Sequence, residues 1–284
     1  MKTIYHFSGA GNDFVVIDGR EGDVSAFREV ATIEALCKEY KTDGLMILGS
    51  GSAEVDFTME FYNPDGSGGM MCGNGGRCIV AFADYLGIRP ASGGVFLFMA
   101  PDGLHTGEIL ARPEDGLWEV RIKMIDVHGV TPMLGGFFLN TGTRHFVKFV
   151  DDVEQVDIDT EGKALRWDPV FAPIGTNVNF VHIAPDGLHV RTFEKGVEGE
   201  TLACGTGLTA SAIAAYEISR QARNDKTVIS TKAGGRAEKS YRLRARQDWL
   251  SVNFTPVGDG EFTDVYLTGP ARLVEIHYFE LPIL

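Results

Sequence analysis

Two cysteines each stand directly before a glycine-rich segment that opens an apolar stretch of helical character. Cys72 begins the string CGNGGRC, and Cys204 begins CGTGLTA. A thiol at the N-terminus of a helix lies beside unpaired backbone N–H groups and the positive end of the helix dipole. This setting lowers the pKa of a thiol and makes its thiolate accessible. Two such positions, one in each half of the chain, predict a pair of thiols that exchange protons with one carbon atom.

The glycines after the cysteines predict how a substrate would be held. Gly73 and Gly205 let the backbone approach a ligand closely, and the free N–H groups of a helix start bind an anion. Two helix starts that face one cleft would hold a carboxylate between them. A thiolate would then take the α-proton from one face of the adjacent carbon, and a thiol would return a proton from the other, with inversion of configuration. Preorganised N–H donors would stabilise the charge that develops.

From the residues alone, other roles for the cysteines stay open. A lone cysteine is most often a buried structural residue, and we expect Cys37 and Cys78 to belong to the core. A thiol nucleophile with a histidine base is a second alternative, because His145 and His182 are available. A dithiol redox pair is a third, which the absence of a CxxC motif disfavours. The cysteine spacing does not match a zinc site either.

The composition is typical of a globular protein. Its 284 residues suggest two domains, since a domain holds roughly 150 residues. A net charge of −13 disfavours nucleic acid as a partner, because phosphate binding needs a basic surface. No stretch reaches the ~18 apolar residues of a membrane span, and no apolar signal segment precedes IYHFSG. Together with the low cysteine content, these features predict a cytoplasmic protein without nucleic-acid or membrane partners.

Apolar periodicity predicts one amphipathic helix and two helices that are apolar on nearly all sides. The amphipathic helix covers residues 30–40. The other two follow the cysteines, over residues 75–86, with Gly87 as the C-terminal stop, and over residues 207–219. Because a helix that is apolar all round is usually buried, we expect each of these two at the centre of its half.

The remaining segments are rich in strands and punctuated by turns. Residues 4–18 predict two strands around a glycine turn. The string APDGLH, a strand–turn–strand phrase, occurs from Ala100 and again from Ala184. Together with the two Cys-Gly helix starts, this repeat favours two similar halves with a boundary near Asp126.

Six strings, in order along nearly the whole chain, resemble the diaminopimelate epimerase family: GAGNDF, FYNPDG, CGNGGRC, TNVNFV, ETLACGTG and YLTGPA. That family is similar to proline racemase in fold and mechanism. The resemblance implies an α+β fold of two pseudo-symmetric lobes, each a β-barrel-like mixed sheet wrapped around a central buried helix. We expect residues 1–125 plus 270–284 to form the N-terminal lobe with Cys72, and residues 126–269 to form the C-terminal lobe with Cys204.

The resemblance also implies an isomerase that works without pyridoxal phosphate and without a metal ion. Its expected reaction inverts the α-carbon of an amino acid and converts LL-diaminopimelate to meso-diaminopimelate for lysine and peptidoglycan biosynthesis. The expected partners are the amino-acid substrate and a second copy of the chain in a homodimer. Two alternatives stay open: a racemase or epimerase for another amino acid of the proline or hydroxyproline type, and a non-catalytic amino-acid-binding protein.

Site roles follow from the resemblance by position. Acid–base chemistry is assigned to two thiols and to two residues that adjust their pKa values and position the amino group: Cys72, Cys204, His145 and Glu194. Substrate binding is assigned to Asn12, Asn63, Gly73, Asn74, Asn177, Lys195, Gly205 and Thr206.

The chain departs from the family pattern where the distal end of the substrate would be recognised. Lys195 stands where the family usually has arginine, and a lysine lacks the bidentate fork that fits a carboxylate. Thr143 and Arg144 replace the usual Asn-Pro, and Gly44 replaces a common glutamine. We hypothesise that Arg144 supplies the guanidinium that Lys195 lacks. The sequence therefore specifies the reaction type better than the substrate.

Overall fold

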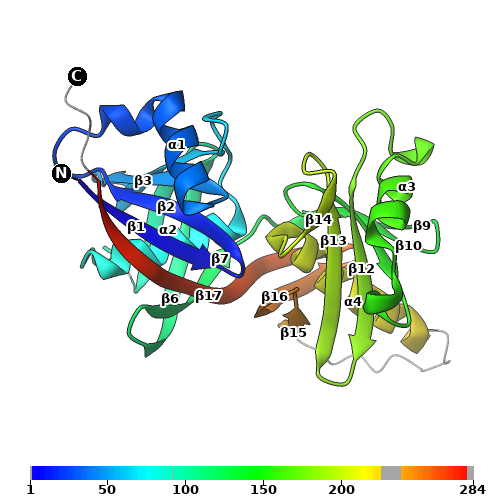
Figure 1. Ribbon diagram of the computed structural model, residues 1–284. Coiled ribbons are helices and arrows are strands. Elements are labelled where there is room, and N and C mark those ends of the chain that lie inside the picture. The colour runs from blue at the N-terminus through cyan, green and yellow to red at the C-terminus, as the bar shows by residue number, and fades with distance from the viewer. Residues whose placement is uncertain (1, 92, 225–237, 280–284) are drawn as a thin grey trace. The chain divides into compact units, whose positions relative to one another are not determined.

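The computed structural model describes residues 2–91, 93–224 and 238–279 (Figure 1). The chain forms two compact units: unit 1 comprises Met1–Ile122 with Thr268–Leu284, and unit 2 comprises Lys123–Leu267. The sequence analysis expected these two limits at 125/126 and 269/270, three and two residues further along the chain. No helix in the described part of the chain is long and apolar enough to cross a membrane.

Unit 1 is built mainly from strands. Its strands are β1 (Lys2–Gly9), β2 (Asn12–Asp18), β3 (Gly44–Ser50), β4 (Phe57–Tyr62), β5 (Val95–Ala100), β6 (Gly103–Glu114), β7 (Leu117–Lys123) and the C-terminal part of β17 (Glu261–Phe279). Its helices are the 3₁₀ turn η1 (Ser25–Arg28), α1 (Val30–Tyr40) and α2 (Gly73–Tyr85).

The strands of unit 1 close into a barrel. Antiparallel pairs β1–β2, β3–β4, β5–β6 and β6–β7 are joined by the parallel pairs β2–β3 and β4–β5. β17 pairs antiparallel with β7 through residues 269–272 and with β1 through residues 272–279. The sheet thereby returns to its first strand, and the result is a closed mixed barrel of eight strands.

Unit 2 contains the other elements. Its strands are β8 (Val127–His128), β9 (Val130–Met133), β10 (Gly136–Asn140), β11 (Arg144–Phe149), β12 (Asn177–Ala184), β13 (Gly187–Glu194), β14 (Gly199–Thr201), β15 (Lys239–Arg244), β16 (Trp249–Gly258) and the N-terminal part of β17. Its helices are α3 (Lys163–Arg166), α4 (Gly205–Asn224) and the short turns η2 (Val153–Gln155), η3 (Ile158–Gly162) and η4 (Pro169–Phe171).

Unit 2 repeats the order of pairings found in unit 1. Antiparallel β10–β11, parallel β11–β12, antiparallel β12–β13, parallel β13–β15 and antiparallel β15–β16 follow one another as β1 to β6 do. In addition, β9 pairs with β10, and β8 pairs with the N-terminal part of β17. The predicted fold class, α+β with two pseudo-symmetric halves, is confirmed.

Each unit packs its strands against one buried helix. In α2, every residue from Gly73 to Ala83 is buried, and the helix contacts β1, β2, β3 and β6. In the same way, α4 contacts β10, β11, β12 and β13. The sequence predicted both helices but began them two residues late, because the glycines themselves form the first turn. Cys72 is the N-cap of α2, and the carbonyl of Cys204 accepts from Leu208 N in the first turn of α4.

The other predicted elements are confirmed. The opening strands turn at Ala10 and Gly11, whose φ values are 58° and 88°, so this turn needs a residue that tolerates the left-handed region. The amphipathic helix covers residues 30–40 as predicted. Cys37 and Cys78 are buried.

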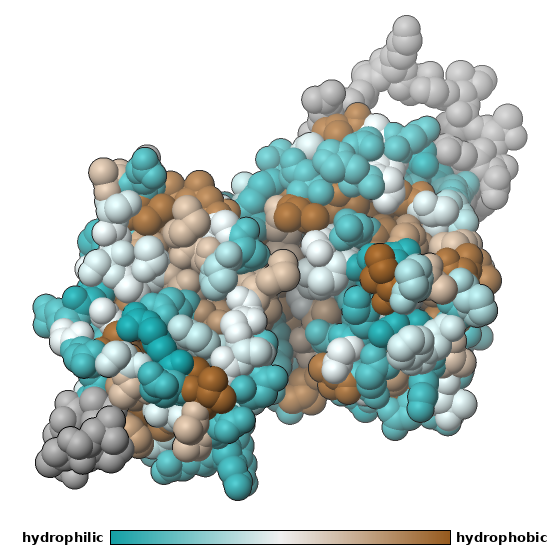
Figure 2. Space-filling view, turned by 90° about the horizontal axis from the view of Figure 1, so that it is seen from above, coloured by the Kyte–Doolittle hydropathy of each residue, from teal (hydrophilic) through white to brown (hydrophobic). Residues whose placement is uncertain are grey.

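The surface mixes polar and apolar side chains. Figure 2 shows hydrophilic residues over much of the visible face, with apolar residues in smaller groups between them. Met70 of unit 1 and Trp167 of unit 2 are among the exposed large apolar residues. Exposed apolar side chains of this kind are normal for a globular protein.

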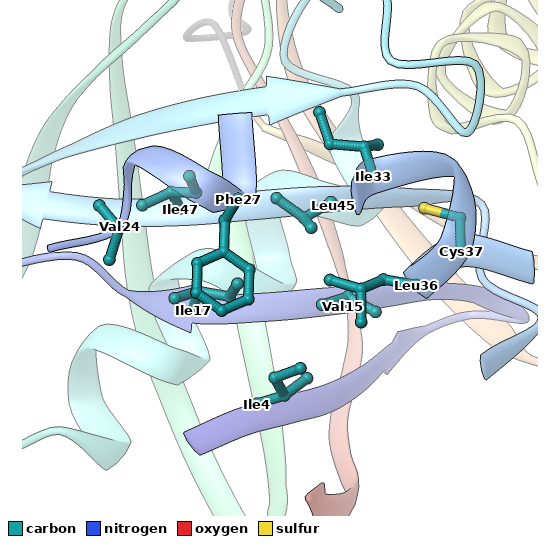
Figure 3. Close-up of a cluster of buried hydrophobic side chains, with 10 residues drawn as sticks. All are labelled: Ile4, Val15, Ile17, Val24, Phe27, Ile33, Leu36, Cys37, Leu45 and Ile47. Atoms are coloured by element: carbon teal, nitrogen blue, oxygen red, sulfur yellow. The ribbon is translucent and has the colours of Figure 1, made fainter. Parts of the chain in front are cut away.

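A core cluster holds α1 against the barrel of unit 1. The cluster consists of Ile4, Val15, Ile17, Val24, Phe27, Ile33, Leu36, Cys37, Leu45 and Ile47. Figure 3 shows the side chains of α1 turned towards those of β2 and β3. This packing holds α1 against β2 and β3. The same two strands also contact α2.

Replacing Ile33 by alanine should destabilise unit 1. The side chain is fully buried in the cluster, so Ile33→Ala leaves a cavity and should lower the free energy of unfolding by about 2–5 kcal/mol. Urea unfolding measures this change. Glu34→Ala, an exposed change in the same helix, is the control and should stay within about 0.5 kcal/mol. Equal effects of the two substitutions would contradict the packing described.

Candidate active site

The thiol of Cys72 lies at the start of α2. The backbone of Cys72 is extended, with φ −99° and ψ 151°, and its Sγ accepts a hydrogen bond from Gly75 N at 3.2 Å. A Cβ on Gly75 would lie only 3.3 Å from this Sγ, so glycine leaves room for the sulfur. Cys72 is exposed. An accessible sulfur that accepts a backbone N–H at a helix start is a setting in which a thiolate is stabilised.

Two asparagines predicted from the sequence meet beside this helix start. Asn74 Nδ2 donates to Asn12 Oδ1, and Asn12 Nδ2 donates to Asp43 Oδ2 at 3.2 Å. Arg77, which is fully buried, donates to Asn74 Oδ1 at 2.9 Å and to the carbonyl of Gly73 at 3.1 Å. The structure thus gathers Asn12, Gly73 and Asn74 around the cysteine, and Arg77 holds Asn74 in place.

Asn63 belongs to a turn at the end of β4. Its Nδ2 donates to Ser67 Oγ at 3.0 Å, and its backbone N donates to the carbonyl of Ser67 at 2.9 Å. These contacts are those of a turn residue, and the substrate-binding role of Asn63 stays a prediction.

The thiol of Cys204 lies at the start of α4 and is 8% exposed. Its Sγ is 3.4 Å from Thr206 Oγ1, and the thiol also hydrogen-bonds the carboxylate of Glu194. Burial raises the pKa of Glu194, and the hydrogen bonds from Thr201 and Cys204 oppose this rise. Thr201 Oγ1 donates to Glu194 Oε2 at 3.0 Å. A carboxyl with a raised pKa next to a thiol is a pair that can share one proton.

His145 is buried behind the second cysteine. Its Nε2 lies 2.9 Å from Thr206 Oγ1 and 2.9 Å from Thr143 Oγ1. Burial lowers the pKa of His145 to about 3, so the imidazole is neutral at neutral pH. His145 therefore reaches Cys204 through the hydroxyl of Thr206. His182 lies on β12, with its ring 6.0 Å from that of His189.

Asn177 links β12 to Lys195. Its Oδ1 accepts from Lys195 N at 2.8 Å, and its Nδ2 donates to the carbonyl of Arg144 at 3.1 Å and to Thr143 Oγ1 at 3.2 Å. The side chain of Lys195 is exposed. Its ammonium has no hydrogen-bond or ion-pair partner among the residues that the structure describes. The charge of Lys195 is therefore available to a ligand.

Arg144 and Gly44 have structural contacts of their own. The guanidinium of Arg144 lies over the ring of Phe138, at 5.1 Å, and donates to the carbonyl of Phe171. Because side chains alternate along a strand, Arg144 and His145 point to opposite faces of β11. These contacts compete with a substrate role for Arg144, which stays a hypothesis. Gly44 begins β3, and a Cβ there would lie 2.7 Å from the carbonyl oxygen of Tyr62.

The sequence analysis missed three polar residues: Asp43, which is exposed, and Arg77 and Asn179, which are fully buried. Asn179 is fully buried on β12, and its Nδ2 lies 3.0 Å from His145 Nδ1. A Cβ on Gly207 would lie 2.3 Å from Asn179 Oδ1 and 3.3 Å from His145 Cε1. The second glycine of CGTG therefore lets α4 approach β12. The one available signal for Arg77 was its charge inside an otherwise apolar helix.

At the start of α2 and at the start of α4, a thiol lies among hydrogen-bonding groups. Within residues 2–91, 93–224 and 238–279, no group of three or more His, Cys, Asp or Glu side chains is arranged to hold a metal ion. None of the four cysteines, all of them described, forms a disulfide.

The fold is one that several solved structures share. A phenazine biosynthesis protein of the PhzF family from Bacillus anthracis matches with a TM-score of 0.69 at 12% identity, covering 99% of each chain. A hydroxyproline epimerase from Agrobacterium vitis matches with a TM-score of 0.60 at 15% identity, covering 97% of this chain and 91% of the other. These likenesses define the class of fold as proline racemase-like.

Sequence comparison identifies the family within that class. A family model described as diaminopimelate epimerase matches residues 4–92 and 137–244. The diaminopimelate epimerase of Flavobacterium psychrophilum is 36% identical over 275 residues, covering 95% of this chain and 97% of the relative. That of Aquifex aeolicus is 39% identical over 287 residues, covering 93% and 98%. The chain belongs to the diaminopimelate epimerase family.

Adding a methyl group at Gly207 should disturb the packing of α4 against Asn179 and His145. Because the new Cβ would collide with Asn179, Gly207→Ala should lower the free energy of unfolding by about 1–3 kcal/mol. Gly199→Ala is the matched control, since a Cβ at Gly199 meets nothing within 4 Å. Urea unfolding of the two variants provides the comparison. If Gly207→Ala is as stable as Gly199→Ala, then α4 does not need the close approach.

Proposed function

We propose that this protein is a cofactor-independent, two-thiol epimerase that interconverts LL- and meso-diaminopimelate in lysine and peptidoglycan biosynthesis. Membership of the diaminopimelate epimerase family, over almost the full length of its relatives, is the observation that carries the reaction and the substrate. The two Cys-Gly helix starts support the assignment of the chemistry to thiols.

In this mechanism the two helix starts bind the carboxylate next to the reacting carbon. Backbone N–H groups at Gly73, Asn74, Gly205 and Thr206 donate to its oxygens, and each helix dipole adds positive potential. The α-carbon gains negative charge as its proton leaves, and the same donors stabilise that charge in the transition state. The mechanism requires both helix starts to face one ligand.

The proton transfer needs one thiolate and one thiol. The thiolate takes the α-hydrogen as a proton and becomes a thiol, and the electron pair stays on the substrate. The other thiol gives its proton to the opposite face and becomes a thiolate, so one turnover inverts the carbon and exchanges the two sulfur states. Gly75 N favours the thiolate of Cys72, and Glu194 accepts the thiol hydrogen of Cys204. Because each turnover exchanges the thiol and the thiolate, the same two cysteines also serve the reverse reaction.

The distal end of the substrate would lie near Lys195. The exposed ammonium of Lys195 fits the distal carboxylate as a point charge, whereas an arginine would fit it as a bidentate fork. Asn63 and Asn177 would supply amide groups beside it. We also propose that the protein acts in the cytoplasm, where a reducing environment preserves both thiols, and that it forms a homodimer.

Each cysteine should be essential for turnover. Replacing Cys72 or Cys204 by alanine removes the acid or the base on one face, so epimerisation of LL-diaminopimelate should fall by at least ~100-fold in either variant. Wild-type protein in D₂O should place deuterium on the α-carbon. Cys37→Ala, a change in the core cluster, is the control and should retain turnover.

The same assay separates the alternatives. Exchange with proline or hydroxyproline in place of diaminopimelate would show a racemase of that type. No exchange with any amino acid would show a binding protein. Wild-type turnover in either cysteine variant would rule out the two-thiol mechanism.

Removing the charge of Lys195 should weaken substrate binding. The loss of a hydrogen bond to a charged group predicts that Lys195→Ala raises KM for diaminopimelate by about 10–100-fold, with a smaller effect on kcat. Lys195→Arg should keep KM low, because a guanidinium also fits a carboxylate. Lys163→Ala, an exposed change on α3, is the control. An unchanged KM in Lys195→Ala, with a raised KM in Arg144→Ala, would transfer the role to Arg144.

A further inference from the structure

A continuous chain of hydrogen bonds runs through unit 2 from β12 to the sulfur of Cys204. Asn179 Nδ2 lies 3.0 Å from His145 Nδ1, and His145 Nε2 lies 2.9 Å from Thr206 Oγ1. Thr206 Oγ1 in turn lies 3.4 Å from the Sγ of Cys204. Asn179 and His145 are both fully buried. Because a neutral imidazole carries one proton, the direction of the link between Asn179 and His145 decides whether Nε2 is a donor or an acceptor towards its neighbours.

The amide of Asn179 has one orientation. Its Nδ2 is 3.3 Å from the carbonyl oxygen of Phe146, and its Oδ1 accepts from Thr192 Oγ1 at 3.0 Å. A flipped amide would place two oxygens against each other at Phe146. The amide nitrogen therefore faces His145, and it donates to His145 Nδ1.

This donor selects the tautomer of His145. Because Nδ1 accepts, the single proton of the neutral imidazole is on Nε2. The ring is neutral at neutral pH, since burial lowers its pKa to about 3. Nε2–H then faces the hydroxyl oxygens of Thr206 and Thr143, each 2.9 Å away, and is a donor towards both. The hydroxyl hydrogen of Thr206 cannot return to Nε2, and it turns to another acceptor.

Two acceptors lie near that hydroxyl. One is Thr143 Oγ1, at 3.2 Å, and the other is the sulfur of Cys204. Thr143 Oγ1 already accepts from Asn177 Nδ2 at 3.2 Å and has a hydrogen of its own to give. A thiolate is charged and is the stronger acceptor. When Cys204 is ionised, the hydrogen of Thr206 therefore points to its sulfur.

We propose that Asn179 is a positioning residue for proton transfer at Cys204, because it fixes the His145 tautomer that turns the Thr206 hydroxyl towards the sulfur. In the other tautomer, the lone pair of Nε2 would accept the hydroxyl hydrogen, and the thiolate would lose a donor. The inference rests on the proposed function and adds to it the group that keeps the second thiol ready to ionise.

Glu194 acts on the same sulfur in the opposite protonation state. The thiol donates to the Glu194 carboxylate, whereas the thiolate accepts from Thr206. Glu194 and, through Thr206, His145 are the ionisable groups of unit 2 in this network. The other ionisable residues on the strands packed against α4 are Arg144, Lys148, His182, His189, Arg191, Lys239, Tyr241, Arg242 and Arg244. Of these, Lys148 pairs with Glu161, His189 with Asp186, and Arg191 with Glu200.

The tautomer can be observed directly. Long-range ¹H–¹⁵N NMR spectra of the full chain, with the His145 signals assigned by their loss in His145→Gln, should show a neutral ring protonated on Nε2 across the neutral pH range. In Asn179→Leu, the signals should move towards protonation on Nδ1, because Thr206 can then donate to Nε2. A wild-type ring protonated on Nδ1, or a ring that titrates near neutral pH, would overturn the proposal.

The effect on sulfur can be measured by titration. In a Cys72→Ser background, the ultraviolet absorbance of the thiolate, minus that of the Cys72→Ser, Cys204→Ser double variant, reports Cys204 alone. Asn179→Leu and Thr206→Val should each raise the pKa of Cys204 by about one unit, since each removes a hydrogen bond to a charged group. Thr206→Ser keeps the hydroxyl and should restore the wild-type value.

A matched control separates this effect from general damage. Ser211 is a buried hydroxyl of α4 that donates to the carbonyl of Gly207 at 2.7 Å, so Ser211→Ala loses a similar bond outside the chain and should not move the titration. A pKa unchanged in Asn179→Leu would overturn the role of Asn179. If Asn179→Leu does not fold, the wild-type tautomer and the contrast between Thr206→Val and Thr206→Ser decide the question.

Neither measurement depends on turnover. A protein that shows the Nε2 tautomer and the shifted titrations, but does not exchange the α-hydrogen of diaminopimelate, would support the hydrogen-bond chain and refute the proposed function.

Discussion

The contact between a sulfur and the backbone N–H groups of a buried helix start is the interaction on which the proposed thiol chemistry depends. In α2, Gly75 N donates to the Sγ of Cys72, and eleven consecutive residues behind that contact are buried. Solvent and salt screen a helix dipole weakly when the helix is buried, so the positive potential at the sulfur persists. The closed barrel of unit 1 is what makes such burial possible, because its strands surround an apolar helix that would be unstable in water.

The two thiols are surrounded by different groups. Cys72 is exposed and sits among amides, with the buried guanidinium of Arg77 fixing Asn74. Cys204 is buried and sits between a hydroxyl donor and the carboxylate of Glu194. A reversible epimerisation needs each thiol to serve as acid in one direction and base in the other, and such a group works best when its pKa is near the operating pH. Cys72 thus has a backbone N–H as its donor, and Cys204 has a side-chain hydroxyl.

Local patterns in the sequence predicted two similar halves and placed the two buried helices to within two residues of their starts. The fold class came from the family resemblance, and neither source predicted the contacts behind the helix starts. The Cys-Gly strings, the starts of the apolar helices and the opening turn are encoded within a few residues, and each lies within two residues of its expected position. Asn12 and Asn74 are 62 residues apart, and His145 and Asn179 are 34 apart. Which polar side chains meet is decided by strand register, which the sequence pattern leaves open. The role of Gly207 could not be predicted from the sequence for the same reason, because this glycine makes room for Asn179, a residue on another element.

The reaction is more firmly specified than the substrate because proton transfer and substrate recognition are assigned to different parts of the chain. The groups assigned to proton transfer lie on α2, α4 and the strands that contact them, where a change in volume is costly because the interior is close-packed. Lys195 lies just beyond the end of β13 with its ammonium exposed, so a lysine can replace an arginine there without repacking. The three departures from the family pattern therefore differ in what they mean for substrate recognition. Gly44 meets a backbone carbonyl, Arg144 packs on Phe138, and Lys195 alone presents an exposed charge that a distal carboxylate could meet.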